Sequence, residues 1–252
     1  MCQDKDCKNL RTGIEQIVNI RWDSVSCMGV LQLQKPLAGQ AFQPTARAHT
    51  LAEVFPVTAS DAAAVGFVLA RLPRTVAPIL WVQDRLSRRE AGRPCLAGIG
   101  TARPIIMVDL SRATDVLWAL EDGLRCRALA AVIGEIWGDP PALDFTATKR
   151  LALRSEGGQV PCWLIRRAAT PNLSAARDRW RIGSVPSAPH PHDAQAPGDP
   201  RWALNLFRSR RSKPGQWVAS YDRAADHINL SAAVRDGTLD AGDGAARQRA
   251  TG

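Results

Sequence analysis

The sequence predicts an α/β protein built on a mostly parallel, twisted sheet of five or more strands, with flanking helices and a β-hairpin near the C-terminus. Between residues 51 and 166, short apolar runs alternate with amphipathic segments, which is the rhythm of repeated strand and helix units. The runs are almost continuously apolar, as expected of strands that helices cover on both faces. Further along, residues 201–221 show a strand pattern, a turn and a second strand pattern.

Five runs of four to six residues predict the parallel strands. Each run is largely aliphatic or aromatic and is bounded by proline, glycine or charged residues. The runs are Leu51 to Phe55, Pro78 to Val82, Ile105 to Val108, Ala130 to Glu135 and Val160 to Ile165.

Three segments between these runs predict helices that pack on the sheet. In the first two, apolar side chains recur every three or four residues and so fall on one helical face. The third is opened by a pair of prolines and closed by a pair of glycines. The helices are expected at Asp61 to Leu72, Ala113 to Cys126 and Leu143 to Glu156.

After Arg167 the pattern becomes irregular before the hairpin begins. A short strand is expected at Arg179 to Gly183, followed by a proline-rich connector that runs to Pro200. The hairpin at 201–221 has a basic tip at Arg211 to Gly215. The expected organisation is therefore a divergent, partly helical N-terminal segment at 1–48, a core domain at 49–223 that includes the hairpin, and a mobile tail at 224–252.

The charge of the chain is concentrated in one block. The 252 residues carry a formal net charge of +9, and residues 149–223 alone hold 14 Lys and Arg against 5 Asp and Glu. Such a block favours phosphate backbones or an acidic protein partner, although solvated arginines on an ordinary surface would give the same count.

Several classes of protein are excluded by composition. The apolar runs are far shorter than the roughly 20 residues that cross a bilayer, and the N-terminus lacks the layout of a secretory signal, so we expect a soluble cytoplasmic protein. Six cysteines without a CxxC pair and four histidines do not fit zinc spacing, and we expect reduced thiols and no metal. His190 and His192 lie in the proline-rich connector and are interpreted as solvated.

The loop after the first strand lacks the groups that bind phosphate. A phosphate loop needs glycines around the phosphates, a lysine for their charge and a hydroxyl for magnesium. The corresponding positions hold Pro56, Asp61, Ala62 and Ala63. Ser60 or Asp61 is expected to cap the following helix, and the sequence predicts no nucleotide site and no cofactor.

Several stretches resemble the ImuA family over about Leu51 to Tyr221. They read LAEVF from Leu51, ILWVQD from Ile79, DVLWALEDGLR from Asp115, AAVIGEIWGD from Ala130, RWRI from Arg179 and PGQW from Pro214. The resemblance implies a RecA-like core encoded with a mutagenic polymerase cassette. Residues 1–48 depart from the glycine-rich approach to the first strand that is usual in the family.

Comparison with the RecA pattern shows which residues stand at the positions of the catalytic groups. The phosphate-loop lysine and hydroxyl fall at Ala62 and Ala63, the water-activating glutamate falls near Arg85, and the γ-phosphate-sensing glutamine falls near Arg167. Glu135 alone keeps a carboxylate, which we expect to be a structural hydrogen-bond acceptor. The resemblance thus implies a RecA-like core that no longer hydrolyses ATP, and we expect that the protein is not an enzyme.

Two sets of residues are candidates for binding a partner or DNA. Arg166 and Arg167 begin the loop at which RecA-like proteins contact DNA. The hairpin interleaves aromatic and basic residues, which can stack bases, dock a protein or simply form surface. These hairpin residues are Trp202, Arg208, Arg210, Arg211, Lys213 and Trp217. Binding of single-stranded DNA, if it occurs here, is expected to be weak and sensitive to salt.

The resemblance implies a non-catalytic accessory protein of SOS-induced translesion synthesis. The implied partners are an ImuB-type polymerase homologue, an error-prone replicative-type polymerase through the same complex, and RecA as a further candidate. Two alternatives stay open: a RecA-like inhibitor of cell division under the SOS response, and a weak, degenerate ATPase that would use Glu135 with Lys149.

Overall fold

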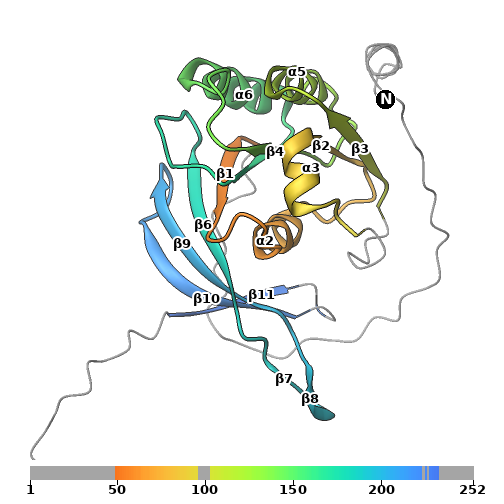
Figure 1. Cartoon of the computed structure of the whole chain (residues 1–252), viewed down its shortest axis with the longest axis vertical. Helices are drawn as coiled ribbons and strands as arrows, with labels where there is room; N and C mark the ends of the chain where they lie inside the picture. Colours follow the sequence, from red (N-terminus) through yellow and green to blue (C-terminus); the bar gives the residue numbers. More distant parts are fainter. Residues whose placement is uncertain (1–48, 96–102, 223–224, 226, 233–252) are drawn as a thin grey trace, which may run out of the picture.

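The computed structural model describes residues 49–95, 103–222, 225 and 227–232 (Figure 1). In these residues nine strands form one sheet, in the order β11-β10-β9-β6-β1-β5-β4-β2-β3. The six strands from β6 to β3 are parallel: β1 Leu51–Pro56, β2 Ile79–Asp84, β3 Ile105–Leu110, β4 Ala131–Trp137, β5 Cys162–Arg167 and β6 Asp178–Val185. The fold is therefore α/β with a mostly parallel sheet, consistent with a RecA-like core.

The remaining strands of the sheet form an antiparallel wing that continues from β6 (Figure 1). The wing contains β9 Arg201–Ser209, β10 Gly215–Asp222 and β11 His227–Ala232. The expected hairpin is confirmed as β9 and β10. The short strand expected at Arg179 to Gly183 is also present, as β6, and it pairs in parallel with β1.

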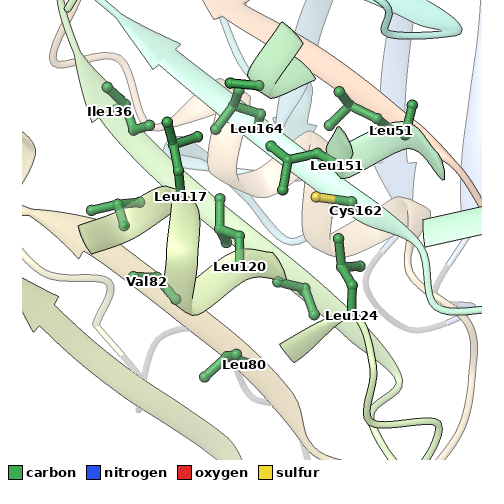
Figure 2. Close-up of a cluster of buried hydrophobic side chains, with 14 of the residues drawn as sticks. Leu51, Leu80, Val82, Leu117, Leu120, Leu124, Ile136, Leu151, Cys162 and Leu164 are labelled. Carbon is green, nitrogen blue, oxygen red and sulfur yellow. The ribbon is translucent and has the colours of Figure 1, made fainter. Parts of the chain in front are cut away.

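Helices cover both faces of the parallel part of the sheet. The described helices are α2 Ala63–Arg71, α3 Arg85–Ala91, α5 Ala113–Gly123 and α6 Phe145–Gly158. Helices α5 and α6 lie on one side, over an aliphatic layer that includes Leu120, Leu151 and Leu164 (Figure 2). Helix α2 lies on the other side, where Phe67 packs with Trp163 and Trp180.

Short polar contacts and small residues set the helix positions. Asp144 caps α6 by accepting a hydrogen bond from the amide of Ala147 at 2.7 Å. At Gly134 of β4 a Cβ atom would lie 2.6 Å from the Leu120 side chain, so only glycine lets α5 approach this closely. Helix α2 begins at Ala63, two residues later than expected, and the Asp61 carboxylate accepts from the Ala63 amide at 2.8 Å.

Four of the described elements, one helix and three strands, were absent from the sequence prediction. Helix α3 has no apolar face, but Asp84 accepts from the Ser87 amide at 2.6 Å and so starts it directly after β2. The proline-rich connector contains a two-stranded β7–β8 pair, Pro189–His190 and Asp193–Pro197. The tail predicted from residue 224 begins too early, because β11 extends the wing to Ala232.

Two predictions concern residues that the structure does not describe. The N-terminal segment at 1–48 and the tail from residue 233 lie outside the described part of the chain. Within the described part, no helix is long and apolar enough to span a membrane.

Candidate functional site

The turn between β1 and α2 holds a side-chain cation. The Arg167 guanidinium, at the end of β5, donates from Nη1 to the carbonyl oxygen of Ala59 at 2.8 Å and to that of Asp61 at 3.4 Å. A phosphate cradle instead points backbone N–H groups inward, toward the anion. The turn is thus organised around a positive charge supplied by the protein itself.

The same arginine neutralises Glu135 in the interior. Arg167 Nε lies 2.6 Å from Glu135 Oε2, and the two side chains are 4% and 0% exposed. The other oxygen, Oε1, accepts from Trp81 Nε1 at 2.7 Å and from Gln83 Nε2 at 3.2 Å. Both carboxylate oxygens are therefore engaged. Glu135 thus accepts hydrogen bonds through both oxygens, and its structural role stays a prediction.

Asp61 joins the start of α2 to β6. Its carboxylate accepts from the Ser184 amide at 2.8 Å and from the Ser184 hydroxyl at 2.6 Å, in addition to the Ala63 amide. Burial by itself would raise the pKa of Asp61, but these hydrogen bonds and the charge of Arg167 outweigh it, so the pKa lies below its usual value. The carboxylate stays ionised at neutral pH, next to where a phosphate would have to bind.

A second buried polar cluster lies on the opposite face of the sheet. Glu53 Oε2 accepts from Arg179 Nε at 2.7 Å, and Glu53 Oε1 accepts from Ser174 Oγ at 2.9 Å and lies 3.7 Å from Arg166 Nη1. Arg166 also contacts Asp139 Oδ1 at 2.6 Å. Burial lowers the pKa of Arg166, and the carboxylates of Glu53 and Asp139 oppose that shift.

Two phenyl rings complete this second cluster. The Arg179 guanidinium carbon lies 5.3 Å from the ring centroids of both Phe55 and Phe207, and that of Arg166 lies 5.6 Å from Phe55. The positive charges are thus held by acids and aromatic faces inside the protein.

The structure corrects the expectation that Arg166, Arg167 and Trp202 face a partner or DNA. Arg166 is 1% exposed and Arg167 is 4% exposed, and each is paired with a buried acid. Trp202 is 5% exposed and packs against α2, where a Cβ atom on Gly66 would lie 2.8 Å from its ring. Trp217 is half-buried, with its ring centroid 6.4 Å from that of Trp180.

The remaining predicted residues form an exposed cluster that we call the basic tip. It contains Arg208, Arg210, Arg211 and Lys213, around the turn between β9 and β10. Ser209 holds this turn: its hydroxyl donates to Asp178 Oδ1 at 2.6 Å and accepts from the amides of Arg211 and Ser212 at 3.0 Å. The cations are therefore mounted on an ordered hairpin.

Strand register separates the basic tip from Arg167. Asp178 begins β6 and pairs with Ala52 of β1 on one side and with Ser209 of β9 on the other. The tip therefore lies at the edge where the parallel strands begin, whereas Arg167 lies at the edge where they end. The Arg166–Arg167 pair and the basic tip therefore do not form one binding surface.

No group of three or more His, Cys, Asp or Glu side chains that could hold a metal ion occurs in the ranges that the structure covers. His190 and His192 lie with ring centroids 5.8 Å apart in the β7–β8 pair, with no such group around them there.

A comparison with known proteins shows which proteins this chain is similar to. No family model matches the chain. It is 34% identical over 157 residues to Protein ImuA of Caulobacter vibrioides, in strains NA1000 / CB15N and ATCC 19089 / CIP 103742 / CB 15. The match covers 58% of this chain and 61% of each relative, so the chain spans about three fifths of their length.

The chain is therefore similar to Protein ImuA over about three fifths of that protein's length. The resemblance inferred from GEIWGD and its neighbouring stretches is thereby confirmed. In this chain the GEIWGD stretch contains Glu135, Trp137 and Asp139, and each has a defined contact: Glu135 with Arg167, the Trp137 amide with Asp84 at 2.9 Å, and Asp139 with Arg166. The most distinctive segment of the sequence therefore organises the buried polar network.

Proposed function

We propose that this protein is a non-catalytic, cytoplasmic accessory protein of SOS-induced translesion synthesis and mutagenesis. Its relationship to Protein ImuA supports the role in mutagenesis. The observation that carries the non-catalytic part is the position of Arg167, which donates to the carbonyls of the turn between β1 and α2 and pairs with Glu135.

The energetics of that position oppose nucleotide binding. A triphosphate could enter the turn only if Arg167 left it, and Glu135 would then be buried without its cation. Breaking a buried pair in this way costs about 3–5 kcal/mol. The Asp61 carboxylate and the inward-facing carbonyls would add repulsion to the cost. The domain accordingly acts by binding other macromolecules, not by phosphoryl transfer.

The basic tip is the surface that we assign to partner docking. Its four cations are exposed, and Ser209 fixes the turn that carries them, so little conformational freedom is lost when a partner binds. A surface of this sign fits an acidic face. The proposed partners are an ImuB-type polymerase homologue, an error-prone replicative-type polymerase reached through that homologue, and RecA.

Capture of the polymerase homologue tests the assignment. The variant Arg208→Ala, Arg210→Ala and Arg211→Ala is expected to lose at least tenfold in capture, with its melting temperature nearly unchanged because the side chains are exposed. The control variant Arg89→Ala, Arg112→Ala and Arg125→Ala removes the same charge from α3 and from the two residues that flank α5, and it is expected to behave as wild type. Equal capture by both variants would contradict docking at the tip.

A genetic test addresses the process itself. Deleting the gene is expected to abolish damage-induced mutation, and the basic-tip variant is expected not to restore it. Filamentation on overproduction, with direct binding to the tubulin-like division protein and unchanged mutation frequency, would instead support an inhibitor of cell division.

A further inference from the structure

The outer faces of α5 and α6 lie side by side on one side of the sheet, and no described helix or strand lies over them (Figure 1). Arg150 of α6 contacts Glu121 of α5 at 2.9 Å and joins the two helices. Each helix returns the chain from the end of one parallel strand to the beginning of another, so the two helices run in the same direction. Trp118 and Ala147 each precede a member of this ion pair by three residues, and they therefore lie about level with one another.

Trp118 lies on the outer face of α5 and is 63% exposed, although tryptophan normally buries most of its ring. Its neighbours Leu117 and Leu120 are buried in the core and fix the rotation of the helix, so the indole points away from the sheet. On the outer face of α6, Leu153 is 55% exposed. Large exposed apolar side chains on a packed helix pair are typical of a docking surface, and tryptophan is among the residues that contribute most to binding.

The two helices differ in charge. Within its bounds α5 holds three acidic residues and no basic one, whereas α6 holds three basic residues and one acidic one. The ion pair with Glu121 uses one of these bases, but Lys149 and Arg154 are exposed and make no ion pair with any residue that the structure describes. Asp122 pairs with Arg125 at 3.3 Å, and both side chains are 59% exposed, so the carboxylate stays accessible to a further cation. The exposed indole and the acids are therefore on one helix, and the available cations are on the other.

We propose that this face, formed by the outer sides of α5 and α6, binds a second copy of the chain around a two-fold axis that runs parallel to the helices. Such an axis lays α5 of one copy over α6 of the other, twice in each dimer. At the height set by the ion pair, Trp118 then lies over the turn from Thr146 to Lys149 of the second copy. Asp122 lies over the turn that follows, so Lys149 meets both an indole face and a carboxylate. An axis across the helices would instead bring the acids of α5 against the same acids of the second copy.

The size of this face predicts a weak dimer. Helices α5 and α6 contain 11 and 14 residues, and they are therefore about 16 and 21 Å long. Two adjacent helices are about 20 Å wide, so each copy offers about 400 Å² in projection, which is below the about 800 Å² of a standard stable interface. We therefore expect a dissociation constant in the micromolar range. The dimer uses neither the basic tip nor the turn before α2, and it does not depend on the proposed function.

Sedimentation equilibrium of the full chain between about 1 and 100 µM tests this proposal. The average mass of the wild type is expected to rise with concentration from that of one chain toward twice that value. Trp118→Ala is expected to raise the dissociation constant at least about tenfold, with a nearly unchanged melting temperature because the side chain is mostly exposed. The matched control is Leu86→Ala, which truncates an apolar side chain that is 47% exposed on α3 and should leave the dissociation constant unchanged.

A charge exchange tests which helix faces which. Lys149→Glu is expected to weaken the dimer about fivefold or more, because the new carboxylate faces Asp122 at two places in each dimer. Adding Asp122→Lys to this variant is expected to recover most of the loss, since opposite charges then face each other again. That recovery would also show that the single variant is folded. The matched control is Lys213→Glu, which makes the same change of charge at the basic tip and should leave the dissociation constant unchanged.

A photo-crosslinker at position 118 identifies what lies on this face. With p-benzoylphenylalanine in place of Trp118, in a mixture of isotope-labelled and unlabelled protein, the expected cross-link joins two copies and falls within residues 146–153. The proposal would be overturned by the mass of one chain up to about 100 µM, by an unchanged dissociation constant for Trp118→Ala, or by a cross-link outside α6, residues 1–48 included. Capture of the polymerase homologue by Trp118→Ala should equal that by wild type. A failure of the dimer is thereby distinguishable from a failure of the proposed function.

Discussion

Arg167 and Glu135 form a buried ion pair, with 2.6 Å between Nε and Oε2, at the end of the sheet where a nucleotide would otherwise bind. The pair also ties β5 to β4, since Arg167 and Trp137 are register partners and Glu135 lies two residues earlier on β4. One side chain thus fills the turn before α2 and balances the charge of the interior.

Replacing Arg167 by Met is expected to destabilise the protein by about 3–5 kcal/mol, because the buried Glu135 side chain loses its cationic partner. The free energy of unfolding from urea denaturation measures this. The double variant Arg167→Met and Glu135→Gln should recover part of the loss. A single variant as stable as wild type would show that the pair contributes nothing.

Replacing Glu53 by Gln should cost a similar amount, about 3–5 kcal/mol, since Arg166 and Arg179 would then face each other in the interior without that carboxylate. The matched control is Glu121→Gln, which breaks the 2.9 Å pair with Arg150, whose side chain is 51% exposed. For this exposed pair, the change in the free energy of unfolding should stay within about 1 kcal/mol. Equal effects of the two substitutions would refute the distinction between the buried and the surface pair.

Asp61 should make the free energy of unfolding depend on pH in the acid range. Its pKa in the folded state lies below the ordinary value of 3.8, so its contribution is fully present above that value and is lost as pH falls through the lower, folded-state pKa. Asp61→Asn is therefore expected to be less stable than wild type at neutral pH and to lose less stability between about pH 5 and pH 2. Denaturation curves across this range measure the difference. Parallel curves for the two proteins would argue against the shift.

Cys162 is expected to resist alkylation in the native state. Complete burial raises the pKa of its thiol to about 12, so almost no thiolate exists at pH 8, and the side chain is 0% exposed. Cys95 is exposed and should react before Cys162. Peptide mapping after brief iodoacetamide treatment tests this, with urea-unfolded protein as the control in which Cys162 reacts. Native labelling of Cys162 at the rate of Cys95 would be contrary to the structure.

Much of the fold follows from local patterns. The five apolar runs became β1 to β5, and the three predicted helices became α2, α5 and α6 with shifted ends. Asp61 accepts from the Ala63 amide at the start of α2, but the N-cap of this helix is Ala62 and not Ser60 or Asp61 as expected. These features depend on side-chain periodicity and on helix capping, both of which are local properties of the chain.

The role of Arg166 and Arg167 depended instead on strand order. Alternation along β5 places them on opposite faces of the sheet, but their partners are set by β5 lying between β1 and β4, which carry Glu53 and Glu135. Local sequence holds no information about that order. A usable signal existed all the same, because single acids inside strongly apolar strands indicate buried cations nearby.

Trp202 was misplaced for a different reason. The alternation of Trp202, Leu204 and Leu206 already indicated one buried face on β9, and the structure confirms that face against α2. Interpreting Trp202 by its arginine neighbours gave too little weight to this period of two. By contrast, Arg208, Arg210 and Arg211 were correctly expected at an exposed turn, where a chain reversal leaves side chains in solvent.

The measurement that tests the central claim most directly is a calorimetric titration of the full-length protein with Mg-ATP. Because Arg167 fills the turn before α2 and Asp61 adds a negative charge there, the account predicts no saturable heat at nucleotide concentrations up to about 1 mM, for which binding would be worth only about 4 kcal/mol. Saturable binding in the micromolar range, abolished by substitutions in the turn at residues 57–62, would contradict it.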